Sequence, residues 1–184
     1  MTLLEHPPPD TGESVHPEPF ILVPYIDGML HNETVESVRA SGYPYALHAL
    51  DPEDPYAYAA LFADNWGRGS DLIIVEQDMI VPDHAVDEFE HCLEPWCSHT
   101  YDCDNEVPAY GLGICRFRYS VQQMWPTLGE QAARDHRGRA RRQHWTTLNE
   151  RIISLMLHWG VKVHLHEPEA RHLHYYGTPD AAAG

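Results

Sequence analysis

Residues 65–78 read NWGRGSDLIIVEQD. Within this stretch, Leu72 to Val75 are four consecutive apolar residues, three of them β-branched, which is typical of a strand covered on both faces of a parallel sheet. Glu76 and Asp78 follow directly, and residues two apart in an extended chain point to the same side. Carboxylates that converge where a buried strand ends can hold a hard divalent cation. The stretch therefore predicts a central strand with a site at its end.

The flanking sequence alternates between strand and helix patterns. The expected strands are residues 20–25, 45–50, 71–75 and 161–165, with an extended segment at 110–119, and the expected helices are residues 32–40, 55–65, 83–92 and 146–159. Pro24 is expected at the end of its strand because proline cannot donate to a sheet ladder. Thr147 and Glu150 have the spacing of a capping box. The alternation predicts an α/β fold with a mostly parallel sheet flanked by helices.

The chain is expected to form a single domain at residues 19–177. Residues 1–18 are rich in proline and predict a flexible arm, and residues 178–184 predict a frayed tail. No apolar run approaches the roughly 18 residues that cross a bilayer, and the N-terminus lacks a basic-then-apolar signal pattern. We therefore expect a cytoplasmic protein with no membrane partner.

The charge balance disfavours tight binding to nucleic acid. Asp and Glu number 28 against 12 Lys and Arg, so the formal net charge is −16, which repels phosphate backbones in general. Five of the 12 basic residues nevertheless lie between Arg134 and Arg142. This run is either a lid whose arginine forks bind diphosphate oxygens or a solvated loop without a ligand.

Residues 65–78 resemble the core signature of GT-A glycosyltransferases, in which a helix ends in an Asn-x-Gly segment and an apolar strand closes with an acidic D-x-D-type motif. The resemblance implies a GT-A-like fold, a nucleotide diphosphate sugar as donor, and Mn²⁺ or Mg²⁺ as cofactor. The metal would be held by Glu76 and Asp78 and would neutralise charge on the departing diphosphate. The implied nucleotide-sugar-binding residues in this part of the chain are Pro24, Tyr25, Asp51, Asn65, Arg68, Glu76 and Gln77.

A later segment also carries a resemblance. Glu94-Pro95-Trp96-Cys97, followed by residues 111–117 (GLGICRF), resembles a compact GT-A-like group of actinobacteria and their phages. There the Gly-Leu-Gly segment lines the acceptor side, so Gly111 and Gly113 would let a sugar ring approach the backbone. The other interpretation is a tight strand turn.

Histidines and cysteines offer further metal ligands. The GT-A resemblance points to His172 as a third protein ligand, with His174 as its rival. His164 and His166 share one face of a strand, and although H-x-H pairs do bind metals, we expect them to be structural. Cys92, Cys97, Cys103 and Cys115 lack C-x-x-C spacing and are expected as free thiols, with a Cys97–Cys103 bridge left open.

The sequence does not identify a catalytic base. At 100° per residue, Asn149 lies on the inward face of the helix at 146–159, and Glu150 points almost the opposite way. An inverting transferase needs a carboxylate as base, and the GT-A resemblance implies that it lies near the start of this helix. Three alternatives stay open: Glu150 swings in, an acid of the loop before Gly111 serves, or the enzyme retains configuration. The acids of that loop are Asp102, Asp104 and Glu106.

The predicted function is transfer of a sugar to a hydroxyl acceptor. That acceptor is a modified DNA base if the chain is phage-encoded, and otherwise a small molecule or a glycan. Two alternatives remain: a zinc-dependent hydrolase that uses His164, His166, His172 and Asp78, or a non-catalytic protein that binds sugar nucleotides. The oligomeric state is open.

Overall fold

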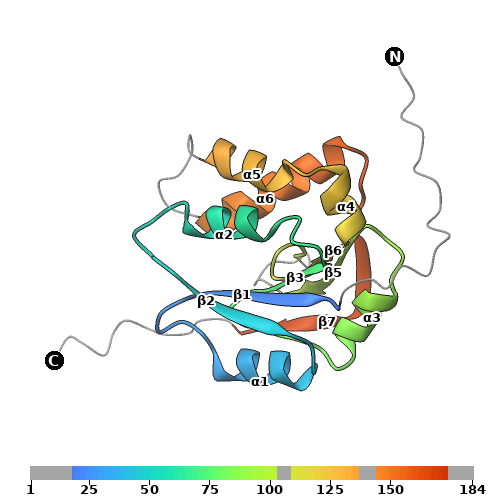
Figure 1. Ribbon diagram of the computed structural model, residues 1–184. Coiled ribbons are helices and arrows are strands. Elements are labelled where there is room, and N and C mark those ends of the chain that lie inside the picture. The colour runs from blue at the N-terminus through green and yellow to red at the C-terminus, as the bar shows by residue number, and fades with distance from the viewer. Residues whose placement is uncertain (1–17, 103–108, 137–143, 174–184) are drawn as a thin grey trace, which may run out of the picture.

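A computed structural model describes residues 18–102, 109–136 and 144–173 (Figure 1). The strands are β1 (Phe20–Ile26), β2 (Tyr45–Leu50), β3 (Leu72–Val75), β4 (Met79–Ile80), β5 (Trp96–Tyr101), β6 (Ile114–Phe117) and β7 (His164–His172). The helices are α1 (Asn32–Ala40), α2 (Ala57–Asn65), α3 (Ala85–His91), α4 (Tyr119–Met124), α5 (Leu128–His136) and α6 (His144–His158). The expected tail, and the expected arm apart from residue 18, lie outside these ranges. None of the helices in the described ranges is long and apolar enough to span a membrane.

The strands form one sheet in the order β2-β1-β3-β6-β5-β7-β4. Strand β1 is parallel to both β2 and β3, and β5 is parallel to β7, whereas β6 runs antiparallel to β3 and β5, and β4 antiparallel to β7. The chain enters β6 directly beside the exit of β3, where the Glu76 N–H donates to the Gly113 carbonyl at 2.8 Å. Because β6 starts at that edge, it can only run back. The predicted α/β fold with a parallel core is confirmed, and it is GT-A-like.

Helices cover both faces of the sheet (Figure 1). Helices α2, α4, α5 and α6 lie above it in the view, and α1 and α3 lie below. Side chains of β3 alternate between the two apolar cores: Leu72 and Ile74 pack in the first, and Ile73 and Val75 pack in the second. All four residues are buried, as predicted from their uninterrupted apolar run.

Pro24 lies inside β1 and not at its end, where it was expected. The N–H groups of Phe20 and Ile26 both point to the β3 side, the first bonding the Asp71 carbonyl and the second the Gln77 side chain. Pro24 shares this orientation, but β1 pairs with β3 only as far as Leu22. The N–H that proline lacks would therefore point to a position where β3 offers no hydrogen-bond partner.

Three further expectations differ from the structure. The last strand begins at His164 and not at residue 161, because Val161 closes the turn after α6 by donating its N–H to the Met156 carbonyl at 2.9 Å. Helix α6 begins at His144, which places Thr147 inside the helix and rules out a capping box with Glu150. Strand β5 was not predicted, because its sequence WCSHTY buries polar residues in its centre.

Candidate functional site

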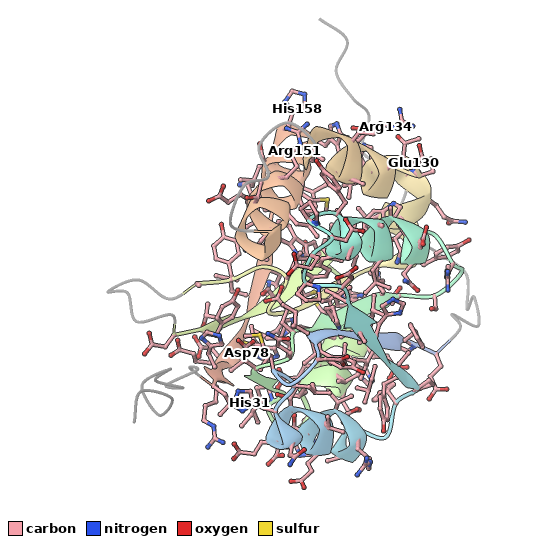
Figure 2. All side chains as sticks on the ribbon, turned by 90° about the vertical axis from the view of Figure 1, so that its left-hand side faces the viewer. His31, Asp78, Glu130, Arg134, Arg151 and His158 are labelled. Atoms are coloured by element: carbon pink, nitrogen blue, oxygen red, sulfur yellow. The ribbon has the colours of Figure 1, made fainter. Side chains whose placement is uncertain are left out.

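The carboxyl edge of β3, which Glu76 and Asp78 follow, lies on the left of Figure 1, and Asp78 is labelled on the same side in Figure 2. Glu76 is half-buried, and its Oε1 accepts a hydrogen bond from the Tyr58 hydroxyl at 3.0 Å. Asp78 lies opposite β7, where its Oδ2 is 3.2 Å from His172 Nε2. The structure thus brings the predicted Asp78 and His172 into direct contact, although 94 residues separate them in the sequence.

The pairing of β4 with β7 produces this contact. Met79 is the register partner of His172, and the Leu173 N–H donates to the Asp78 carbonyl at 2.6 Å. The other ring nitrogen, Nδ1, is 3.1 Å from the Asp102 carbonyl oxygen. An Nδ1–H that donates to a backbone carbonyl fixes the ring so that Nε2 faces the site, which is the common arrangement of metal-binding histidines.

The charges at this edge perturb one another. Burial and the neighbouring Asp78 carboxylate raise the pKa of Glu76 to about 8. The hydrogen bond with Asp78 raises the pKa of His172 above its ordinary value. The edge therefore favours binding a proton or a cation, a property that clusters at functional sites.

Asp78 and His172 contact each other, whereas Glu76 contacts Tyr58. In the described ranges, one group of three potential ligand atoms lies within 4.8 Å of one another, and it is formed by Cys92, His164 and His166. Glu76 is turned toward Tyr58, so the predicted metal ligands that meet here are Asp78 and His172. His174 lies outside the described residues.

The predicted nucleobase residues lie along the same edge. Pro24 and Tyr25 pair with His48 and Ala49 near the end of β2, and Asp51 follows β2 directly. Asp51 is exposed, and its Oδ1 accepts the Glu53 N–H at 2.9 Å. Tyr25 near the end of β1, Asp51 after β2 and Asp78 after β3 therefore lie at the carboxyl ends of three adjacent parallel strands, where ligands bind in open α/β sheets.

Gln77 holds the fold together at this edge. Its Oε1 accepts the Ile26 N–H at 2.7 Å, and its backbone carbonyl accepts the Thr34 hydroxyl at 3.0 Å and the His31 N–H at 3.1 Å. The side chain is only 7% exposed. The predicted nucleotide-binding residue is thus occupied in joining β1 and the start of α1 to the end of β3.

Asn65 and Arg68 lie at the opposite edge of the sheet. With Phe20 and Leu72, the first residues of β1 and β3, they line a shallow hollow. The Asn65 amide donates to the Leu61 carbonyl at 2.8 Å, and Arg68 Nε donates to the Asp64 carbonyl at 2.6 Å. The chain must traverse β3 before it reaches Glu76, so the structure does not bring this predicted pair to the carboxylates.

The two predicted acceptor-side glycines are buried. A Cβ on Gly111 would lie 2.0 Å from Asn149 Oδ1, and one on Gly113 would lie 2.6 Å from the Tyr101 ring. Their missing side chains make room for this protein's own residues and not for a sugar ring. The geometry of this segment therefore favours the tight-turn interpretation.

The candidate bases lie as follows. Asn149 points inward as predicted, but its Oδ1 accepts the Leu112 N–H at 3.0 Å, and Glu150 is exposed. Asp102 is exposed beside His172. Asp104 and Glu106 lie outside the described residues.

Of the arginine run at residues 134–142, Arg134 is the one arginine that lies within the described residues. Arg134 Nη2 pairs with Glu130 Oε2 at 2.6 Å on the surface of α5, and Figure 2 shows this pair far from Asp78. Residues 137–143, which contain the other four arginines of the predicted lid, lie outside the described residues.

Sequence reasoning missed two aromatic residues of the site. Tyr58, 2% exposed, lies within the helix predicted at residues 55–65, but the sequence did not connect it with Glu76. Tyr101 packs its ring against that of His172, with centroids 5.8 Å apart. The apolar face of α2 could have suggested the first contact, whereas the second depends on β5, which the sequence pattern does not indicate.

Comparisons with known proteins agree with this fold. No protein-family model matches the chain, and no curated protein matches it significantly. Among solved structures, it is similar to a glycosyltransferase involved in the glycosylation of the major capsid of PBCV-1, with 12% identity, 83% of each chain covered and a TM-score of 0.53. It is also similar to A197 from STIV, with 8% identity, 85% of this chain and 86% of that chain covered, and a TM-score of 0.56. At these identities the similarity concerns the fold alone.

Proposed function

We propose that the chain is a metal-dependent glycosyltransferase that takes a sugar from a nucleotide diphosphate sugar. The observation that carries the proposal is the contact of Asp78 with His172 at the carboxyl edge of a GT-A-like sheet. A fold similar to that of a viral glycosyltransferase supports it. The acceptor is a hydroxyl compound, for which a modified DNA base, a glycan and a small molecule are the candidates to be tested.

The donor atoms fit a divalent metal. Asp78 supplies a carboxylate oxygen and His172 a ring nitrogen oriented by the Asp102 carbonyl, and the carboxylate of Glu76, turned toward Tyr58, adds negative charge to the same edge. One carboxylate together with substrate phosphates is the usual set for Mg²⁺, and Mn²⁺ shares this preference for oxygen ligands. When bound, the metal supplies charge neutralisation at the leaving diphosphate.

The other residues of the edge bind and orient. The Tyr25 ring and the Asp51 carboxylate lie where the base and ribose would bind. The Tyr58 hydroxyl holds Glu76 in place. Because Asn149 is occupied by the Leu112 N–H and Glu150 is exposed, we infer that neither takes the acceptor's proton in the geometry seen.

The zinc-hydrolase alternative does not survive in its original form. His164 and His166 lie at the start of β7 and His172 at its end. Eight residues of extended strand separate the first from the last, about 25 Å at ~3.3 Å per residue. These histidines and Asp78 therefore cannot bind one metal ion.

Thermal unfolding with donor candidates tests the proposal. The melting temperature is measured with UDP-, GDP-, TDP- and CDP-sugars, with and without Mn²⁺. A ligand at 100 times its dissociation constant adds about 2.7 kcal/mol, so at least one donor should raise the melting temperature in a Mn²⁺-dependent way. Asp78→Asn and His172→Gln should each abolish the Mn²⁺-dependent part.

Asp83→Asn is the matched control, because Asp83 is an exposed acid five residues away in sequence. It should behave like the unmodified chain. A Mn²⁺-dependent shift that persists in Asp78→Asn would refute the site, and the absence of a shift with every donor would refute the function.

A further inference from the structure

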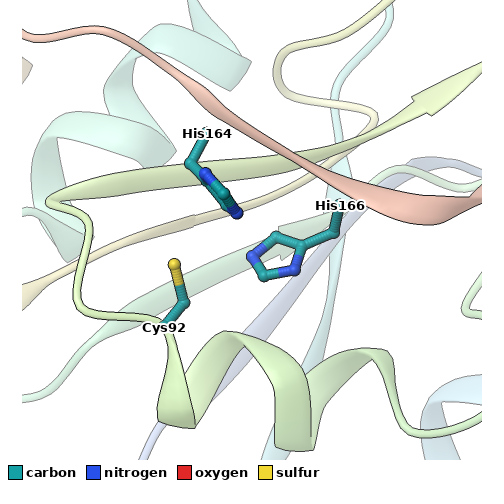
Figure 3. Close-up of side chains that lie close together, drawn as sticks. All are labelled: Cys92, His164 and His166. Carbon is teal, nitrogen blue, oxygen red and sulfur yellow. The ribbon is translucent and has the colours of Figure 1, made fainter.

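A thiol and two imidazoles meet at the other end of β7, beside α3. Cys92 directly follows α3, and His164 and His166 open β7. One ligand atom from each lies within 4.8 Å of the other two. Figure 3 shows the Cys92 sulfur and the two rings turned toward a common space.

His166 is oriented as a ligand would be. Its Nδ1 lies 3.7 Å from Glu88 Oε2, and its Nε2 is buried without a hydrogen-bond partner among the described residues. A buried polar atom left in this state requires an explanation, for which a bound ion is one candidate. Metal-binding histidines commonly turn their second ring nitrogen to a carboxylate, which is the position of Glu88.

We propose that Cys92, His164 and His166 form a zinc site that ties the end of α3 to the start of β7. Thiolate sulfur and imidazole nitrogen are the ligands that Zn²⁺ prefers, and tetrahedral bonding places such atoms about 3.5 Å apart. The exposed His164 side chain can rotate to close that distance. The fourth position is open to water.

Cys92 has one thiol neighbour. Cys97 Sγ lies 2.9 Å from Cys92 Sγ, to which it donates a hydrogen bond, and Cys97 itself accepts a hydrogen bond from Arg116 Nη2 at 2.9 Å. Arg116 is fully buried and so holds Cys97 in place. A Cys92 thiolate that accepts this one hydrogen bond keeps lone pairs for a metal. The site stands at the opposite end of β7 from Asp78 and His172, and the two are independent of each other.

Cobalt titration of the metal-free, reduced full chain tests the proposal. Equimolar Co²⁺ should give the visible bands of a tetrahedral complex and a sulfur-to-metal charge-transfer band, and Zn²⁺ should displace it. Cys92→Ser should lose the charge-transfer band, and His164→Ala should weaken binding at least tenfold. Glu88→Gln, which removes the carboxylate behind His166, should weaken it about 10- to 100-fold.

Two variants serve as controls. His48→Ala removes an exposed histidine from β2, and Glu130→Gln removes an exposed acid from α5, so both should titrate like the unmodified chain. His164 is exposed, so its replacement should leave the circular dichroism spectrum unchanged and keep the titration interpretable. The proposal is overturned if the unmodified chain gives no thiolate band, if Cys92→Ser retains it, or if Cys92 forms a disulfide with Cys97 under these conditions.

Discussion

Asn149 Oδ1 accepts the backbone N–H of Leu112 at 3.0 Å, and its amide nitrogen lies 3.4 Å from the Tyr110 carbonyl. Helix α6 thereby holds the turn at residues 110–113, which leads into β6. This turn also fixes the backbone of Glu76, because the Glu76 N–H donates to the Gly113 carbonyl at 2.8 Å. The Asn149 amide thus positions the backbone beside Glu76, at the place where the sequence analysis sought a catalytic acid.

We predict that Gly111→Ala destabilises the protein. Gly111 has φ +133°, and an added Cβ would lie 2.0 Å from Asn149 Oδ1. The backbone strain alone costs about 1–3 kcal/mol. For a chain of this size each kcal/mol lowers the melting temperature by about 2–4 °C, so thermal unfolding will detect it.

Two further variants separate the cost of backbone strain at Gly111 from the cost of steric overlap with Asn149. Gly42 has φ +78°, and a Cβ there would meet nothing within 4 Å, so Gly42→Ala should cost less than Gly111→Ala. Combining Gly111→Ala with Asn149→Ala should cost less than the sum of the two single changes, because they share one contact. Strict additivity would contradict the role assigned to Asn149.

We predict that Gln77→Ala affects stability and not metal-dependent donor binding. The change leaves the Ile26 N–H without the partner it now has at 2.7 Å, and an unsatisfied buried donor costs about 1–3 kcal/mol. The melting temperature should fall, while the additional shift caused by Mn²⁺ and donor should keep its size. If that additional shift disappears and the melting temperature of the free protein is unchanged, Gln77 contacts the ligand as the sequence suggested.

The sequence predicts local patterns better than pairings across the sheet. The strand at 72–75 and the acids after it could be predicted from the sequence, because burial and strand spacing act on neighbouring residues. The contact of Asp78 with His172 has no local signal of its own and was found only through a family resemblance. Gly111 kept two interpretations because a missing side chain is equally compatible with a ligand and with Asn149, and the sequence alone does not distinguish the two.

Asp71 and Arg116 form a buried ion pair. Arg116 is fully buried, and its Nη1 lies 2.9 Å from Asp71 Oδ2, while its Nη2 donates to the Cys92 and Glu94 carbonyls at 2.9 Å each. Asp71 also accepts the Tyr119 N–H at 2.7 Å. The pair thus joins the start of β3, the middle of the sheet and the start of α4.

Asp71→Asn should therefore destabilise the protein by about 3–5 kcal/mol, because it leaves a buried guanidinium without its counter-charge. Denaturant unfolding at constant pH measures the change. Glu130→Gln is the matched control: it removes the partner of Arg134 from a surface pair whose side chains are 71% and 60% exposed, and such pairs contribute about 0–1 kcal/mol. Equal effects of the two substitutions would show that the Arg116 charge is compensated by its carbonyl partners alone.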